Sequence, residues 1–232
     1  MGRIIEIFRV NVETLKKRIR LLLQTQSLPR CRAALRGIPE ITIINTLFSF
    51  LYDPEELTKW RAVTLMGRIT SALAGKNMEA ARIVMRRLMW SLNEESGGIG
   101  WGAPEAMGEI MYHNRRLAVE YHKILISYVM PEANYIELEM LQRGVLWAIA
   151  RLADKRPRLM GPAVPYLRPY MISGDPYLKA FAAWAAGALK SAGAAPVPDE
   201  IFRDRTELTV YIGDRIARRT VGEVARGSRA EF

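Results

Sequence analysis

The chain has 232 residues, half of them apolar, and carries a formal net charge of +10 at pH 7. Its single cysteine, Cys31, excludes an intramolecular disulfide and favours a reducing compartment. No stretch approaches the ~20 uninterrupted apolar residues that cross a bilayer, and the N-terminus lacks the pattern of a signal peptide. We therefore expect a cytoplasmic protein with no membrane partner.

The positive charge is concentrated at the N-terminus. Residues 1–36 hold nine Lys or Arg against two Glu, a net charge of +7. Apolar residues at spacings of three and four predict an amphipathic helix over 3–24 with a strongly basic polar face. A second helix is expected over 29–36, before Gly37.

Helical periodicity continues through most of the remaining chain. The further helices that it predicts are 41–51, 54–74, 78–92, 102–112, 115–130, 133–154, 158–172 and 176–192. Asp53-Pro54 and Asp175-Pro176 each offer a capping Asp followed by Pro at the first helical position. Three prolines must bend or shorten the helix over 158–172.

The C-terminal part changes its pattern. After a linker over 193–198, apolar residues alternate from Leu208 to Ile212, Gly213-Asp214 provides a two-residue turn, and a second strand returns to Val221. This pattern predicts a β-hairpin, which must pack on the helices or add a strand to something else. We expect residues 226–232 to be frayed. The predicted division is a helical domain over 1–195 and a linker, hairpin and tail over 196–232.

A pattern of tryptophan and small residues returns along the helices. Its copies are Trp60–Ile69, Trp101–Ile110, Arg143–Leu152 and Ala180–Leu189, and their anchors Gly67, Gly108, Ala150 and Gly187 are separated by 41, 42 and 37 positions. That period is typical of two-helix repeats that stack into a solenoid. The sequence predicts an all-α, right-handed α-α superhelix with a short C-terminal β-hairpin. The copies would lie on outer helices, and 78–92, 115–130 and 158–172 on inner ones.

These copies resemble HEAT repeats, and specifically the HEAT-like variety named after phycobilisome lyases, over roughly residues 38–193. The segment 90–110 is also similar to a group of uncharacterised bacterial HEAT-like proteins. The chain departs from the pattern at Ala150, which replaces Gly, and at Pro104 inside a helix. The resemblance implies a HEAT/armadillo-like solenoid. It implies no single activity, because such proteins include scaffolds, adaptors, lyase subunits, a hydroxylase and DNA glycosylases.

Four tryptophans share one face of the helices that carry the copies. Trp60 and Trp101 precede their anchors by seven positions, and Trp147 and Trp184 precede theirs by three, which places all four on one helical face. Such a ridge could anchor a protein partner. The alternative is that the hairpin, a long loop or a neighbouring repeat covers it.

A glycine-rich loop over 93–102 departs furthest from a plain repeat. Its Glu94 and Glu95 could form an acidic pocket with Glu105 and Glu109, which lie one helical turn apart. The alternative is that these carboxylates only favour a helix N-terminus. Neither a dinucleotide-binding nor a P-loop fingerprint is present. His113 and His122 lie nine positions apart and Cys31 has no partner at ligand spacing, so we predict no metal, cofactor or catalytic set.

Basic residues give an alternative function. A groove for a phosphate backbone could combine the N-terminal helix with cations of the expected inner helices: Lys16, Lys17, Arg20, Arg82, Arg86 and Lys123. Solvated helix faces would carry the same charges without a partner.

We therefore predict a non-enzymatic scaffold or adaptor that binds a protein or peptide, with no prediction of its oligomeric state. The candidate contact residues are Glu94, Glu95, Trp101, Glu105, Trp147 and Trp184. Nucleic-acid binding is the second hypothesis, and an enzyme with an acidic site near 94–109 is the third.

Overall fold

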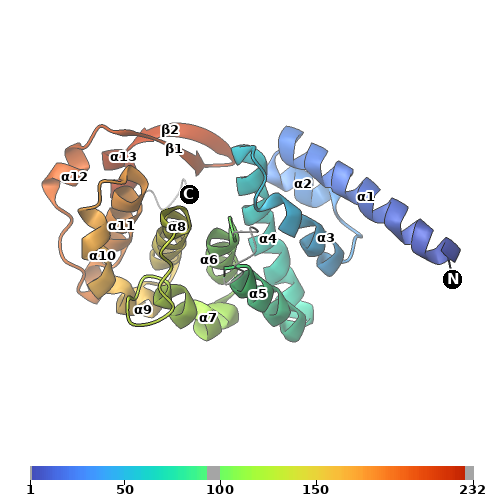
Figure 1. The fold of residues 1–232 in the computed structure, drawn as a ribbon, viewed down its shortest axis with the longest axis horizontal. Helices are drawn as coiled ribbons and strands as arrows, with labels where there is room; N and C mark the ends of the chain where they lie inside the picture. The colour runs from blue at the N-terminus through green and yellow to red at the C-terminus, as the bar shows by residue number, and fades with distance from the viewer. Residues whose placement is uncertain (1, 93–99, 228–232) are drawn as a thin grey trace.

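The computed structural model of the chain describes residues 2–92 and 100–227, with side chains from residue 13 onward. Helices form a two-layered arc, and a β-hairpin crosses the inner layer of that arc (Figure 1). An all-α fold with a C-terminal hairpin was predicted from the sequence, and the structure confirms it. No described helix is both long and apolar enough to cross a membrane.

The inner layer consists of the helices that carry the repeated pattern. They are α4 (Glu56–Lys76), α6 (Ala103–His113), α8 (Glu139–Lys155) and α11 (Pro176–Ala188), and each packs on the next. Two anchor glycines make that packing possible. A Cβ at Gly67 would lie 2.7 Å from Glu109 Cβ, and one at Gly108 would lie 2.7 Å from Ala148 Cβ. Neighbouring helices therefore meet where the sequence places its smallest residues.

The outer layer follows the outside of the arc in Figure 1. It is formed by α5 (Met78–Leu92), α7 (Arg115–Ser127), α9 (Pro157–Met160) and α10 (Val164–Met171). The predicted helix over 158–172 is divided by a 3₁₀ turn at Gly161–Ala163, as its prolines require.

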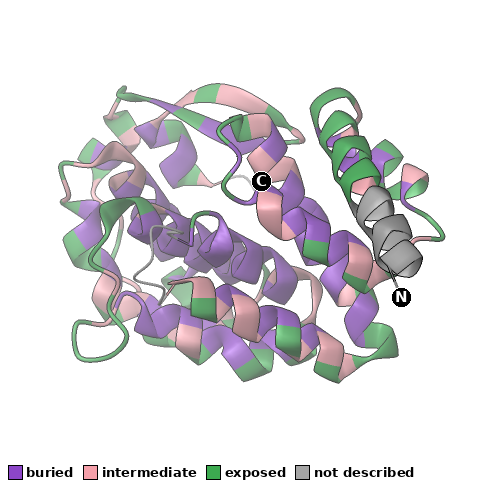
Figure 2. Ribbon diagram, turned by 45° about the vertical axis from the view of Figure 1, so that its right-hand side comes forward, coloured by how far each residue is buried: buried purple, intermediate pink, exposed green. Residues whose placement is uncertain are grey.

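The predicted order of the two layers was wrong. The copies of the pattern lie on inner helices, and 78–92, 115–130 and 158–172 belong to the outer layer. The physical reason lies in how many faces each helix buries. The inner helices are covered by the outer layer on one side and by the hairpin on the other, so they are buried along most of their length (Figure 2).

The C-terminal segment covers the inner layer. Strands β1 (Glu207–Ile212) and β2 (Arg215–Thr220) pair antiparallel with Ile212 opposite Arg215, so the predicted hairpin and its two-residue turn are confirmed. Short helices α12 (Asp199–Arg203) and α13 (Val221–Arg226) flank the hairpin. Figure 1 shows the hairpin reaching from the α11 end of the arc to the α4 end. Its apolar residues join the same core as the helices.

Fraying was predicted from residue 226 onward. In the structure, Arg226 is the last residue of α13 and Gly227 packs against Trp184. The end of α13 packs on α11, where a Cβ at Gly227 would lie 2.7 Å from Trp184 Cδ1. The rest of that segment, 228–232, lies outside the described residues.

At the other end of the arc, α1 (Gly2–Thr25), α2 (Leu28–Ala34) and α3 (Glu40–Leu47) pack beside α4. Ile19 and Leu23 are fully buried, so the second half of α1 belongs to the core. Figure 1 shows the first half of α1 extending beyond the arc.

Candidate functional site

A cavity of about 400 Å³ lies where the N-terminal halves of the inner helices meet β1. Aromatic rings form much of its wall: Trp60 from α4, Trp147 from α8, Tyr177 and Phe181 from α11, and Tyr211 from β1. Charged side chains complete it: Glu56 and Lys59 from α4, Glu105 from α6 and Arg143 from α8. Residues separated by as many as 155 positions in sequence therefore meet at one site.

Three rings of the aromatic wall contact one another. The Tyr211 and Trp60 rings are parallel within 3° at a centroid distance of 5.7 Å, and the Trp147 ring, tilted by 57°, lies 4.8 Å from Trp60. Such tight packing fixes the rings in place. The hairpin residue Tyr211 thus holds the rings of α4 and α8 in position.

The four sequence-predicted tryptophans do not form an exposed ridge. Trp147 is 3% exposed and packs on Trp60, and Trp184 is 1% exposed and packs on Gly227 of the C-terminal segment. The indole Nε1 of Trp184 donates a hydrogen bond to Asp154 Oδ2 at 2.9 Å. Trp101 remains 41% exposed and Trp60 is half-buried. A partner can therefore reach Trp101, whereas Trp147 and Trp184 are buried, and of these two only Trp147 lines the cavity. The alternative that neighbouring elements cover the tryptophans holds for Trp147 and Trp184.

The predicted acidic pocket also changes. Glu94 and Glu95 lie outside the described residues, and the other two carboxylates are separated. Glu105 lines the cavity, whereas Glu109 lies between α6 and α8 and bonds to Arg151 Nε at 2.7 Å. Glu105 and Glu109 therefore do not belong to one site.

Glu109 is the centre of a buried ionic cluster. Its second oxygen lies 3.2 Å from His113 Nε2, and the Arg151 guanidinium stacks 3.8 Å from the centre of the Tyr112 ring. Burial raises the pKa of Glu109, but the hydrogen bond from His113 and the charge of Arg151 outweigh it, so the pKa lies below its usual value. The cluster joins two inner helices.

Glu105 has fewer partners. It is 6% exposed, and its Oε1 lies 3.7 Å from Lys59 Nζ, which is too long for a hydrogen bond. Its Oε2 is buried and accepts no hydrogen bond within the described structure. Among the candidate residues predicted from the sequence, Glu105 is thus one that lines the cavity and retains an oxygen able to accept a hydrogen bond.

Arg143 of α8 also lines the cavity. Its Nη2 donates to Asp175, the N-cap of α11, and to Glu139 at 3.3 Å. Its guanidinium lies 4.9 Å from the centre of the Tyr177 ring. Nε of Arg143 is buried and has no acceptor among the described residues.

The hairpin over this cavity is fixed at both ends. At the turn, the Asp214 carboxylate accepts from Arg61 Nε at 2.7 Å and from the backbone N–H of Leu28 at 2.9 Å. Near the other end, the Tyr177 hydroxyl accepts from Thr209 N at 3.1 Å and lies 3.3 Å from Thr209 O. These contacts hold the hairpin against the helices that form the floor of the cavity.

The candidate nucleic-acid residues do not form one groove. Arg82 bonds to Glu120 at 2.7 and 2.8 Å, and Arg86 bonds to Glu79 at 2.7 Å. These arginines lie on the outer layer, and their hydrogen bonds lower the pKa of both Glu79 and Glu120. The remaining candidates are scattered: Arg20 pairs with the buried Asp53, and Lys16, Lys17 and Lys123 are exposed on α1 and α7.

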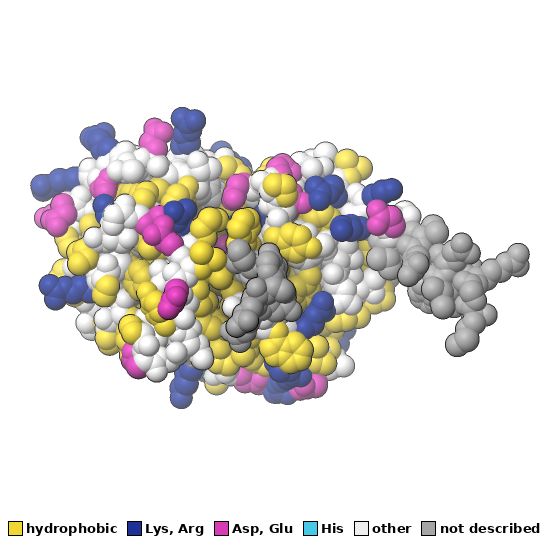
Figure 3. Space-filling view, in the orientation of Figure 1, with side chains coloured by type: hydrophobic (Ala, Val, Ile, Leu, Met, Phe, Trp, Pro, Cys, Tyr) yellow, Lys and Arg dark blue, Asp and Glu magenta, His cyan; other side chains and the backbone are white. Residues whose placement is uncertain are grey.

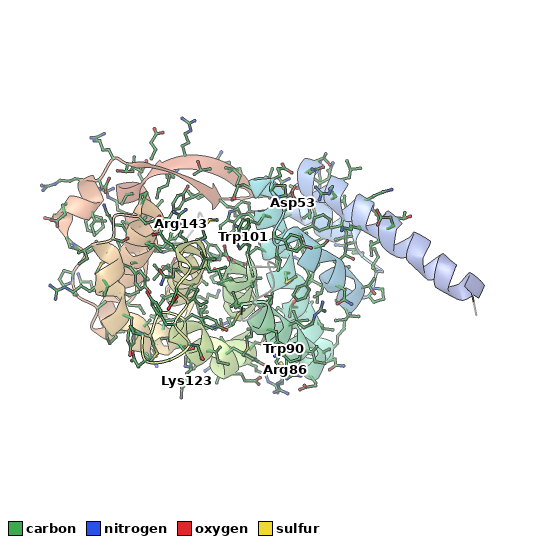
Figure 4. The ribbon with its side chains drawn as sticks, viewed as in Figure 1. Asp53, Arg86, Trp90, Trp101, Lys123 and Arg143 are labelled. Carbon is green, nitrogen blue, oxygen red and sulfur yellow. The ribbon has the colours of Figure 1, made fainter. Side chains whose placement is uncertain are left out.

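Figure 4 shows that the candidate peptide-binding residues lie apart from the candidate nucleic-acid-binding residues. Arg143 and Trp101 lie on the hairpin side of this face, whereas Arg86, Trp90 and Lys123 lie at its opposite edge. Figure 3 shows hydrophobic side chains gathered across the middle of the same face. Within residues 2–92 and 100–227, no cluster of His, Cys, Asp and Glu could hold a metal ion.

Sequence reasoning missed Lys59, Arg143, Tyr177 and Tyr211 as site residues. Of these four, only Tyr211 could have been found from the sequence. It is an aromatic residue of the predicted hairpin, and the hairpin was one of the elements expected to cover the tryptophans. The others meet because α4, α8 and α11 lie side by side, which no local pattern records.

Comparisons with known proteins give a relative of undetermined activity. No protein-family model matches the chain. An uncharacterized protein of Archaeoglobus fulgidus is 28% identical over 184 residues, which cover 78% of this chain and 92% of that protein. The crystal structure of an engineered protein aligns with a TM-score of 0.45 at 18% identity and covers 78% of this chain and 82% of its own. The chain is thus a helical protein with a C-terminal hairpin, similar in sequence to an uncharacterized archaeal protein.

Proposed function

We propose that this chain is a HEAT-like, non-enzymatic adaptor that binds a peptide or a peptide-like segment of a protein at the cavity beneath the hairpin. The observation that carries this proposal is the cavity itself. Its volume of about 400 Å³ lies within the range of pockets that bind ligands, and its wall is rich in aromatic side chains. Trp, Tyr and Arg are also the residues that most often dominate binding energy at interfaces.

The rim of the cavity supplies apolar surface for a larger partner. Met140 is 49% exposed and lines the cavity. Trp101 is exposed in the turn that precedes α6, four residues before Glu105 in sequence. A partner could therefore insert one side chain and cover the rim with its neighbours. The hairpin already occupies the rest of the inner layer, so binding would be local and not spread along the arc.

The lining favours binding over acyl-transfer chemistry. Among the described residues that form the cavity there is no Ser, Cys or His to act as a nucleophile–base pair. Glu56 accepts a hydrogen bond from Trp60 Nε1 at 3.0 Å, and the opposite charges of Lys59 and Glu105 lie side by side. The nucleic-acid hypothesis has weaker support, because Arg82 and Arg86 are already paired with carboxylates.

Selection from a displayed library of random peptides tests this function. The immobilised protein should enrich a consensus sequence, and the enriched peptides should lose at least tenfold in affinity for Met140→Asp. Val119→Asp is the matched control, because Val119 is an exposed apolar residue of the outer layer. Failure to enrich any sequence, or equal affinity for the wild type and Met140→Asp, would contradict the proposal.

A further inference from the structure

Two buried polar atoms of the cavity lack partners, and they are of opposite kinds. Glu105 Oε2 is an acceptor and Arg143 Nε is a donor, and neither forms a hydrogen bond in the described structure. Both residues line the same cavity. Buried polar groups in proteins are nearly always satisfied. Of the buried side-chain atoms without a hydrogen bond in the described structure, these two belong to residues that share this cavity, where a bound group would complete both.

Gly144 allows the Glu105 carboxylate to reach this position. A Cβ at residue 144 would lie 2.6 Å from Glu105 Oε2 and 2.7 Å from its Cδ. Any larger residue would displace the carboxylate from the wall. The glycine of α8 therefore maintains the open acceptor.

The charges of the lining indicate a ligand with no net charge. Glu56 and Glu105 balance Lys59 and Arg143, so a charged ligand would leave one charge without compensation in a partly desolvated space. The aromatic wall favours an apolar side chain. A peptide unit offers one N–H donor and one C=O acceptor without a net charge.

We propose that the cavity binds an uncharged, apolar residue of the partner, whose backbone N–H donates to Glu105 Oε2 and whose backbone C=O accepts from Arg143 Nε. This inference rests on the proposed peptide-binding function and specifies its anchor residue. The anchor does not extend the sheet at Thr209, since the Tyr177 hydroxyl already occupies the backbone edge there.

Blocked single amino acids test the anchor directly. The probes are N-acetyl-leucinamide and N-acetyl-phenylalaninamide, compared with the N-acetyl amides of lysine and glutamate and with free leucine. The readout is the indole N–H resonance of Trp60 in ¹⁵N NMR spectra, assigned with Trp60→Phe. We expect the two apolar amides to shift this resonance with dissociation constants at least tenfold lower than those of the charged amides.

Variants separate the hydrogen bonds from the packing. Gly144→Ala should reduce the affinity for N-acetyl-leucinamide at least tenfold, whereas Gly75→Ala should leave it unchanged, because a Cβ at Gly75 meets nothing within 4 Å. Glu105→Gln retains an acceptor oxygen and should bind within threefold of the wild type. Glu105→Met removes the acceptor and should lose at least tenfold. Backbone amide spectra establish that each variant is folded.

Three results would overturn the inference: no shift with any probe, preference for a charged amide, or binding of free leucine without binding of its blocked amide. If displayed peptides bind while the apolar amides do not, the anchor is wrong and the adaptor function stands. If the amides bind but no displayed peptide is enriched, the cavity recognises a small molecule and the adaptor function fails.

Discussion

The two ends of the contact between α6 and α8 use the same residue type for different purposes. Glu109 lies towards the C-terminal end of α6, where one oxygen accepts from Arg151 Nε of α8 at 2.7 Å and the other lies 3.2 Å from His113 Nε2. Glu105, one turn earlier on α6, opens on the cavity beneath the hairpin and has an unused oxygen. A carboxylate that accepts a hydrogen bond from an arginine of the neighbouring helix stabilises the fold. One that is buried at a cavity without such a bond is a candidate for binding.

Removing each carboxylate in turn gives the largest expected contrast. Glu109→Leu should lower the free energy of unfolding by about 3 kcal/mol, the lower end for breaking a buried ion pair, since Arg151 keeps its contact with the Tyr112 ring. Glu105→Leu should change it by less than about 1 kcal/mol, because Lys59 is partly exposed and can turn to solvent. Urea unfolding followed by circular dichroism measures both values. Equal losses would remove the distinction between the two ends.

The positions of the inner helices were predictable, but their layer was not. Spacings of 41, 42 and 37 between anchors located four helices, and two of the anchors, Gly67 and Gly108, are contact points between neighbouring inner helices. Periodicity shows which face of a helix is buried, but a helix buried on two faces gives the same signal in either layer. The hairpin that covers the second face decides the layer, and its contacts with α4 through Arg61 and Asp214 join residues 153 positions apart.

The same Asp-Pro capping motif has different outcomes at its two positions, because residues distant in sequence differ around them. Asp175 caps α11 by accepting from Leu178 N at 2.8 Å, as its Asp-Pro dipeptide predicts. Asp53 precedes the same dipeptide pattern but does not cap α4; one oxygen accepts from Glu55 N and the other pairs with Arg20 at 2.7 Å. The cavity could not be predicted for a similar reason: Lys59, Arg143 and Tyr177 meet only through packing.

A smaller effect is expected from the glycine that lies between the two carboxylates. Gly108→Ala should destabilise the protein by about 1–3 kcal/mol, because the added Cβ would lie 2.7 Å from Ala148 Cβ and push α6 away from α8. Gly187→Ala is the matched control: it alters the same repeat position, where the nearest atom is Ala225 O at 4.0 Å. It should be neutral or stabilise by up to about 1 kcal/mol, since Ala favours helix. Thermal unfolding compares the two variants. A loss at Gly187 as large as at Gly108 would show that repeat position, and not helix contact, determines the cost.

The smallest expected effect is the pH dependence of the Glu109 cluster. Its pKa in the folded protein lies below the ordinary value of 4.5, so the folded state holds the charged form more strongly than the unfolded chain does. This contribution is fully present above pH 4.5 and is lost as the pH falls through the folded-state pKa.

The stability difference between the wild type and Glu109→Gln should therefore be constant between about pH 6 and 7 and should shrink towards about pH 3. Urea midpoints measured at each pH give this difference, and Glu137→Gln, which removes the same charge at an exposed position, controls for net charge. A difference that stays constant down to pH 3 would mean that burial offsets the partners of Glu109. The ion pair would then specify how α6 meets α8 without contributing to acid stability, and only the position of Glu105 at the cavity would distinguish the two carboxylates.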